Sequence, residues 1–269
     1  KNRNDKGNKS DRIDARKLAR MLRNGDLSPV YHGHDETKVL KELVRGYEHV
    51  VMDSVRAKNR LKAIYRSQGE MTSGGSVYRL EEREEWLSKL SSPGLRARAE
   101  WLYSQIESLD QVRDEAEEAV VCEARKHRVC KLVRSVPGIG PIRSATIVAH
   151  VATPLRFRTK RQFWTYCGLA VVTTSTSDWV KDGDQLVRKD RPVATRGLNK
   201  NHNRSLKNVF KGAVHDAGAF RPHLQYLVES GIRESMARLT VARKIAATTL
   251  TIWKKGEKFD LSKAVIRSE

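Results

Sequence analysis

The chain has 269 residues, which is enough for one large domain or two ordinary domains with a hydrophobic core. Lysine and arginine number 52 against 32 aspartate and glutamate residues, so the formal net charge is +20. An excess of this size predicts a polyanionic partner, nucleic acid before an anionic membrane surface. No apolar run approaches the roughly 18 residues that cross a bilayer, so we expect no membrane partner. The three cysteines (Cys122, Cys130 and Cys167) form no CxxC pair, which favours ordinary thiols in a reducing cytoplasm over a zinc site.

The first predicted helix covers residues 11–24, and Asp11 and Asp14 at its head allow two interpretations. With Asp11 as the N-cap and Asp14 at position N3, the pair makes a start like a capping box and suits the helix dipole. Alternatively, residues at i and i+3 share a helix face, so both carboxylates could reach one divalent ion. Two carboxylates seldom suffice for two-metal phosphoryl transfer, and the residues alone leave both interpretations open.

Two long helices are predicted next, over residues 36–68 and 95–133. Each keeps an apolar stripe at helical spacing, and a glycine- and serine-rich break, GEMTSGGS, lies between them. The middle of the second helix is acidic, with six carboxylates and one arginine over residues 107–118. Helices this long with little globular core to cover predict an extended hairpin with a coiled-coil partner, although packing within the chain explains the same stripes.

The segment LVRSVPGIGPIRSATIVAHV is the clearest local motif. Gly138, Ile139 and Gly140 lie between two apolar helical stretches, which is typical of a helix-hairpin-helix unit. In such a unit backbone N–H groups face a phosphate, and glycine permits the close approach. We therefore predict that the loop binds DNA backbone without reading sequence; a plain helix–helix turn is the alternative.

Basic residues follow the loop in two places. The first group is interleaved with aromatic residues and consists of Arg156, Arg158, Lys160 and Arg161. Basic residues among aromatics suit a nucleic-acid groove, although aromatics at helical spacing favour a core. The second group gives residues 181–211 nine basic residues against three aspartates, and it includes Arg196 and Lys200. We interpret this stretch as a phosphate track, with a solvated charged face as the alternative.

Five hydroxyl residues in a row, Thr173 to Ser177, lie between these basic groups. A hydroxyl attacks a phosphodiester only when it is deprotonated and the phosphate charge is neutralised, and the basic residues on either side could supply the second condition. From spacing alone, a serine–threonine turn or an edge strand explains the run better than a nucleophile does.

Several segments together resemble one family, the insertion-sequence transposases with an Asp-Glu-Asp-Asp RuvC-like domain, which are bridge-RNA-guided recombinases. KSDRIDARKLARMLRNGDLSPVY resembles the segment that carries the third and fourth acidic residues of that family. LVRSVPGIGPIRSATIVAHV with FRTKRQFWTYCGLA resembles the start of its C-terminal transposase domain. RGLNKNHNRSLKNVFKGA resembles the helix entry after that domain's active-site loop. The segments follow the family's order over nearly the whole chain.

The resemblance implies two half-sites. In the family four acidic residues hold magnesium, and Asp11 and Asp14 match the last two, so the first two would precede residue 1 and the chain looks N-terminally truncated. The other half-site is a serine after the GLA segment that attacks DNA and becomes joined to it. Counting from Gly168, that position falls on Thr176, with Ser175 and Ser177 on either side. This departs from the pattern and leaves three candidates, with the two serines favoured because a primary hydroxyl is less hindered.

The resemblance also implies the organisation and the partners. The expected fold is mainly α, with a remnant of an RNase H/RuvC-like α/β domain over 1–34, a long helical hairpin over 35–131 and a mostly helical transposase domain over 132–269. The expected activity is DNA cutting and rejoining through a seryl-phosphate intermediate. Expected partners are DNA, Mg²⁺, a structured guide RNA and further copies of the chain as a dimer or tetramer, in a bacterial or archaeal cytoplasm at the nucleoid. A non-catalytic nucleic-acid-binding remnant and a metal-dependent junction nuclease are the alternatives.

Overall fold

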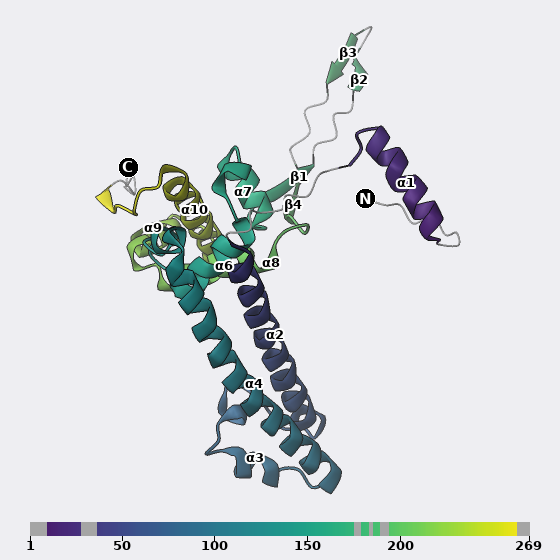
Figure 1. Cartoon of the computed structure of the whole chain (residues 1–269), viewed down its shortest axis with the longest axis vertical. Coiled ribbons are helices and arrows are strands. Elements are labelled where there is room, and N and C mark those ends of the chain that lie inside the picture. The colour runs from purple at the N-terminus through teal and green to yellow at the C-terminus, as the bar shows by residue number, and fades with distance from the viewer. Residues whose placement is uncertain (1–9, 28–36, 175–178, 183–184, 189–193, 263–269) are drawn as a thin grey trace. The chain divides into compact units, whose positions relative to one another are not determined.

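A computed structural model describes residues 10–27, 37–174, 179–182, 185–188 and 194–262. The described chain is mainly helical, as predicted (Figure 1). It divides into two compact units, residues 1–33 and residues 34–269. In the described part, no helix is long and apolar enough to cross a membrane.

The first unit contains one described helix, α1 (Asp11–Arg23). Its N-cap is Ser10, whose extended backbone (φ −134°, ψ 146°) lets the hydroxyl accept a hydrogen bond from the Ile13 N–H. The interpretation of Asp11 as the N-cap is therefore wrong. The helix starts one residue earlier than predicted, so Asp11 and Asp14 both lie in its first turn. Their negative charges are stabilising there because they interact favourably with the helix dipole.

The second unit begins with the predicted helical hairpin, formed by α2 (Lys38–Ser67) and α4 (Pro93–Lys126) (Figure 1). The connection is more than a break, because it contains η2 (Ser76–Tyr78) and α3 (Arg83–Ser88). Apolar side chains from this connection and from both long helices form a separate core at the closed end of the hairpin. Its members include Leu61, Tyr65, Trp86, Leu87 and Tyr103.

The second long helix is shorter than predicted. It ends at Lys126, because His127 adopts an extended backbone (φ −94°, ψ 113°), and the separate helix α5 (Arg128–Val133) follows. After this interruption, Cys130 and Val133 are buried in the core that the following helices share. The tertiary packing of these two residues therefore overrides a sequence pattern that reads as one helix.

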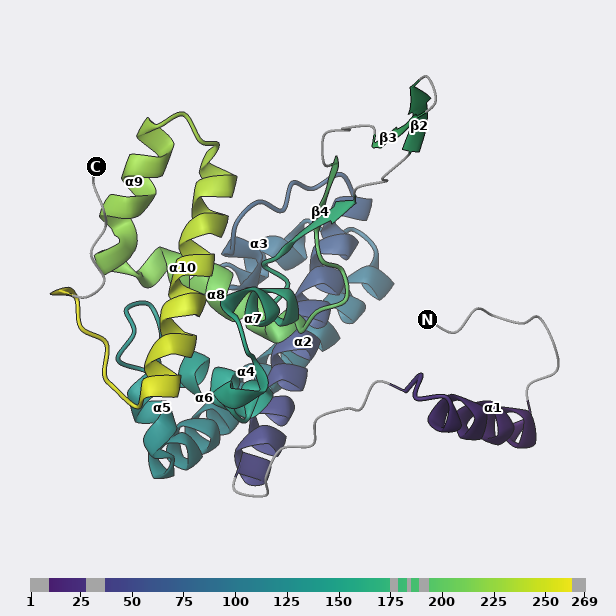
Figure 2. The same ribbon diagram turned by 90° about the horizontal axis from the view of Figure 1, so that it is seen from above.

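The remaining helices surround α10 (Glu234–Lys255), which packs on α5, α7 (Lys160–Tyr166), α8 (Arg204–Asp216) and α9 (Arg221–Glu229) (Figure 2). The helix α6 (Pro141–Val151) packs on α8 and on both hairpin helices. The same part of the chain contains two short 3-10 helical turns, η3 (Pro154–Arg156) and η4 (Gly218–Phe220). Leu40, Val44, Val120 and Ala124 of the hairpin belong to the same core as these helices.

The aromatic residues among the first basic group are core residues, as their helical spacing favoured. Phe157 and Phe163 are buried with ring centroids 5.0 Å apart, and Phe163 also meets Phe210 of α8 edge to face at 5.7 Å. Trp164 and Tyr166 are partly buried against this core. The aromatic rings therefore hold α7 in place.

Among the described residues between α7 and α8 there are four short strands. β1 (Val171–Thr174) pairs antiparallel with β4 (Ala194–Leu198), with an irregular register between Val171 and Thr173. Between them β2 (Trp179–Asp182) pairs antiparallel with β3 (Gln185–Arg188). The interpretation of an edge strand at the start of the hydroxyl run is confirmed for Thr173 and Thr174. Part of the predicted phosphate track thus lies in nested β-hairpins.

Candidate functional site

The two acidic candidates lie on one turn of α1. Both Asp11 and Asp14 are exposed, and at i and i+3 they share a helix face. Over the residues that the structure describes, no group of three or more histidine, cysteine, aspartate or glutamate side chains could hold a metal ion. Two carboxylates are ligands of the kind that Mg²⁺ prefers, but as a donor set they are incomplete.

The three nucleophile candidates, Ser175, Thr176 and Ser177, lie outside the described residues. The segment before them is described, and it is anchored by two hydrogen bonds and by close packing against one aromatic ring. Arg243 Nε of α10 donates to the Leu169 carbonyl at 2.7 Å, and the Asn199 N–H donates to the Ala170 carbonyl at 3.0 Å. Gly168, at φ +67°, lies so close to the His202 ring that a Cβ would come within 2.4 Å of it. The base of the β1–β4 pair is therefore held firmly against the helices.

The first two residues of the glycine loop, Gly138 and Ile139, face the protein interior. Gly138 has φ +84°, and a Cβ there would lie 2.3 Å from the Ala213 carbonyl oxygen of α8. Ile139 is buried, and its N–H bonds to the Val136 carbonyl at 3.0 Å. Arg143 fastens the same loop to α8, because it donates to the Gly138 carbonyl at 2.8 Å and to the Asp216 carboxylate. These contacts explain the first glycine by packing, and that DNA binds here stays a prediction.

The basic candidates have different surroundings. The Arg156 guanidinium lies over the rings of Phe157 and Tyr166, at 5.1 and 4.8 Å from their centroids, and donates to the Val151 carbonyl. Arg158, Lys160, Arg161 and Lys200 are exposed, and Arg196 is described only as a backbone position in β4. Lys160 lines a cavity together with residues of α10. Arg156 therefore has an internal role, whereas the exposed residues remain available to a ligand.

A part-buried chain of polar side chains joins three segments that the sequence does not connect. His150 of α6 bonds through Nε2 to Glu48 of α2 at 3.1 Å and through Nδ1 to the Asn203 amide at 3.1 Å. The Asn203 Oδ1 accepts from the Leu206 N–H as the N-cap of α8, so the amide nitrogen faces His150 and donates to Nδ1. That places the imidazole proton on Nε2, toward Glu48.

The ionisation of Glu48 follows from this arrangement. Burial by itself raises the pKa of Glu48, but hydrogen bonds from His150 and Ser205 and the electrostatic influence of His150 and His49 lower the pKa below its usual value. No pattern in the sequence predicted this cluster, because 102 residues separate Glu48 from His150. It ties the hairpin to α6 and to the start of α8.

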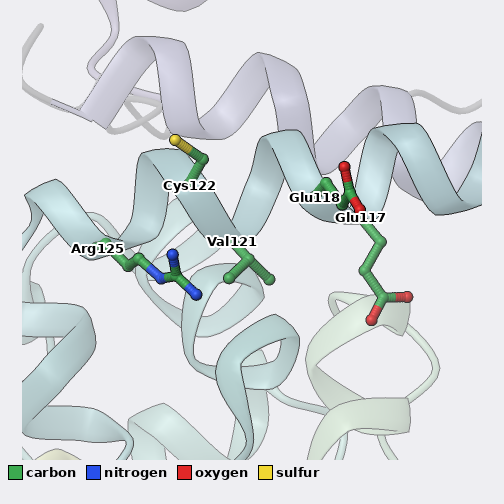
Figure 3. Close-up of a pocket in the computed structure, with 5 residues that line it drawn as sticks. All are labelled: Glu117, Glu118, Val121, Cys122 and Arg125. Atoms are coloured by element: carbon green, nitrogen blue, oxygen red, sulfur yellow. The ribbon is translucent and has the colours of Figure 1, made fainter.

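Another cavity, of about 420 Å³, lies against α4 (Figure 3). Its lining residues are Glu117, Glu118, Val121, Cys122 and Arg125, which Figure 3 shows spreading from a single helix. Glu117 accepts a hydrogen bond from the Tyr47 hydroxyl at 3.4 Å. These five side chains include no nucleophile paired with a base, so the cavity supports no catalytic interpretation.

The cysteines behave as ordinary thiols, as expected. Cys130 and Cys167 are buried and Cys122 is exposed, and none is in a disulfide. Burial raises the pKa of Cys130 to about 12 and raises the pKa of Cys167 as well. The two buried thiols are therefore protonated at neutral pH and poor nucleophiles.

Comparisons with known proteins identify two domains. Residues 1–67 match the family DEDD_Tnp_IS110, described as Transposase, and residues 130–198 match the family Transposase_20, described as Transposase IS116/IS110/IS902 family. The chain is also 23% identical over 167 residues to the transposase for insertion sequence element IS1111A of Coxiella burnetii (strain RSA 493 / Nine Mile phase I). That match covers 61% of this chain and 46% of the relative, so the chain spans less than half of the relative's length. Two segments of the chain, residues 1–67 and residues 130–198, are thus similar to transposase domains of the IS110/IS116/IS902 families.

Proposed function

We propose that this chain is a DNA transposase of an insertion sequence, which cuts DNA strands and joins them to new ends. The observation that carries the proposal is the presence of both transposase matches on one polypeptide, in residues 1–67 and 130–198. The formal net charge of +20 supports it, because an enzyme acting on DNA must hold a polyanion.

The acidic half of the proposed site is Asp11 and Asp14 in α1. Their carboxylates would hold Mg²⁺ together with further oxygen ligands, since two carboxylates complete no site by themselves. The ion, when bound, would stabilise the negative charge that develops on the phosphate and the leaving oxygen. The residues' own contribution is to place two negative charges side by side on one turn of a helix.

The second half of the proposed site is the hydroxyl group of Ser175, Thr176 or Ser177. Its oxygen would bond to a DNA phosphorus while a strand oxygen leaves and takes up a proton, which gives a covalent protein–DNA phosphodiester. Attack by a new strand hydroxyl would then release the protein and join the DNA. The firm attachment of residues 168–170 and 199–203 supports this role, because a nucleophile must be held in a defined position by the residues that flank it.

We further propose a structured guide RNA, a homo-oligomer and a place at the nucleoid in the cytoplasm. These proposals rest on the family resemblance of the sequence, and the basic composition is consistent with both nucleic acids. The long hairpin would bring copies together, so that the carboxylates of one copy could meet the hydroxyl of another.

A test combines the protein with DNA that flanks its gene, RNA transcribed from the same locus, and Mg²⁺. The chain as it stands is compared with a form that includes any in-frame residues encoded upstream of Lys1. We expect a covalent protein–DNA adduct that survives denaturing gel electrophoresis. The triple variant Ser175→Ala/Thr176→Ala/Ser177→Ala should abolish it, and Asp11→Asn/Asp14→Asn should reduce it by at least about a hundredfold.

The outcomes separate the competing functions. An adduct that persists in the triple variant would show that the nucleophile lies elsewhere. Strand nicks without any adduct would identify a metal-dependent nuclease that uses water, and DNA binding without cleavage would identify a non-catalytic binding protein.

A further inference from the structure

Four lysines that no sequence motif connects line one cavity beside the C-terminal end of α10. The cavity has a volume of about 360 Å³ and lies between α10, the segment 257–260 that folds back after it, and the start of α7. Lys244 and Lys255 come from α10, Lys258 from the returning segment, and Lys160 from α7. We call this cavity the lysine groove.

One face of α10 forms the floor of the lysine groove. Lys244, Thr248, Thr251 and Lys255 follow one another at i, i+4, i+7 and i+11, which places them on a single helix face. The opposite face is buried through Ile245, Leu250 and Trp253. Small side chains between the lysines, Ala247 and the two threonines, leave the space open, and the two lysines at the ends are about 16 Å apart along the helix axis.

The four ammonium groups have no carboxylate partner in the part of the chain that the structure describes. Within the described residues none of them forms an ion pair, whereas Lys58 and Lys126 of the hairpin helices and Lys89, the C-cap of α3, each pair with a carboxylate. Two carboxylates, Glu257 and Asp260, also line the groove, and Asp260 accepts from both the N–H and the hydroxyl of Ser262. The charge of Lys244 contributes, after burial, to lowering the pKa of His223. The groove therefore has a surplus of positive charge.

The lysines are not explained by the end of α10 alone. A helix C-terminus favours basic residues, and Lys254 and Lys255 both lie in the last turn. Lys254, however, donates to the Phe157 carbonyl and so has an internal role. Lys160 and Lys258 come from other segments and converge on the same space, which an end effect does not require.

We propose that the lysine groove binds the phosphodiester backbone of a nucleic-acid strand. Lysine ammonium groups spread over about 16 Å match a ligand with charges repeated along its length, and phosphates recur about every 3.4 Å along each strand of a duplex. The partly buried Phe259 in the lining supplies apolar surface on which a sugar or base can rest. The inference deepens the proposed function and rests on it, since it says where a transposase of this sequence holds its nucleic acid.

The test measures how salt changes the affinity for labelled oligonucleotides. Fluorescence anisotropy is recorded with single-stranded DNA, single-stranded RNA and duplex DNA between about 50 and 200 mM salt. The variant Lys244→Gln/Lys255→Gln should weaken binding of the strand type that occupies the groove by about tenfold at the lowest salt. The slope of log affinity against log salt should fall by about 1.4 for a single strand or about 1.8 for a duplex.

The matched control is Lys38→Gln/Lys41→Gln, which removes the same charge from the exposed start of α2. It should leave the slope unchanged, and thermal melting must show both doubles folded. If the two double variants lose affinity equally, or if Lys244→Gln/Lys255→Gln keeps the wild-type slope, the lysine groove is not the nucleic-acid-binding site. If polyglutamate of equal charge competes as well as the oligonucleotides, the phosphodiester assignment is wrong. If the wild-type chain binds none of the three, both the groove and the proposed function fall.

Discussion

Gly138 and Gly140 flank the same buried isoleucine, but they meet different surroundings. Gly138 adopts φ +84° directly against the backbone of α8, whereas a Cβ on Gly140 would have no atom within 4 Å. Gly140 serves as the N-cap of α6, with ordinary backbone angles. Backbone conformation and close packing therefore explain glycine at position 138, whereas the N-cap role explains it at position 140.

We expect Gly138→Ala to lower the free energy of unfolding by at least about 2 kcal/mol, because it combines a left-handed backbone with a clash against the Ala213 carbonyl. Gly140→Ser should stay within about 0.5 kcal/mol of the wild type, since serine is a good N-cap and has room. Urea unfolding measures both. Equal losses in the two variants would contradict the packing role of Gly138.

Glu48 provides a prediction for pH. Its pKa is lowered in the folded chain, so its ionised form stabilises the fold above its unfolded pKa, and that contribution is lost as the pH falls through the lower, folded value. We expect Glu48→Gln to cost about 1–2 kcal/mol near neutral pH and progressively less as the pH falls below about 4.5. The control Glu42→Gln removes an exposed carboxylate of the same helix and should show a small, nearly constant effect. If the loss in free energy of unfolding caused by Glu48→Gln does not shrink in acid, ionised Glu48 is not the source of this stabilisation.

The helical hairpin is built from two apolar ends and a polar middle. Leu40 and Val44 of α2 join the core of the C-terminal helices, whereas Leu61 and Tyr65 join the core at the closed end. Between them Asp110 of α4 accepts from Ser54, Lys58 and Arg113, and Glu117 accepts from Tyr47. The acidic stretch of the sequence thus supplies the contacts that join the two helices where no large apolar core does.

Because the two cores are separate, we expect Trp86→Ala to destabilise the closed end by about 3 kcal/mol while sparing the other core. Hydrogen exchange should speed up for amides of α3 and of α2 around Leu61, and stay slow in α8 and α10. Trp101→Ala is the control, because Trp101 is 71% exposed and its removal should cost less than about 0.5 kcal/mol. Uniform acceleration over the whole chain would show that the cores unfold together.

For the assembled molecule, α4 offers a specific test of the proposed oligomer. Trp101 and Val112 are 71% and 45% exposed and lie eleven residues apart, which places them on one helix face. If copies meet along this face, Trp101→Glu should weaken self-association by at least about tenfold, because it puts a charge into an apolar contact. Light scattering coupled to size-exclusion chromatography measures this. If the wild type and Trp101→Glu have the same mass throughout a concentration series, any interface between copies lies elsewhere.

Local patterns in the sequence were sufficient to predict much of the fold. The apolar stripes predicted α1, α2 and most of α4, and the aromatic spacing around Phe163 correctly predicted core positions. The motifs shared with transposases were likewise recognisable in the sequence, and the comparisons bear out the family domains. The break at His127 and the exact N-cap of α1 were missed, because a backbone change of one residue leaves little trace in a periodic pattern.

The sequence by itself determined the long helices, the positive charge and the resemblance to transposase domains, because each of these depends on residues that are near neighbours or on sums over the chain. Only the tertiary structure decided which distant residues meet. It joined Glu48 to His150 and Asn203, pressed Gly138 against α8, and brought Lys160 to the lysines of α10. The physical reason is that these contacts are set by how the helices pack on their shared core, and the polar residues that meet there carry no periodic signal of their own.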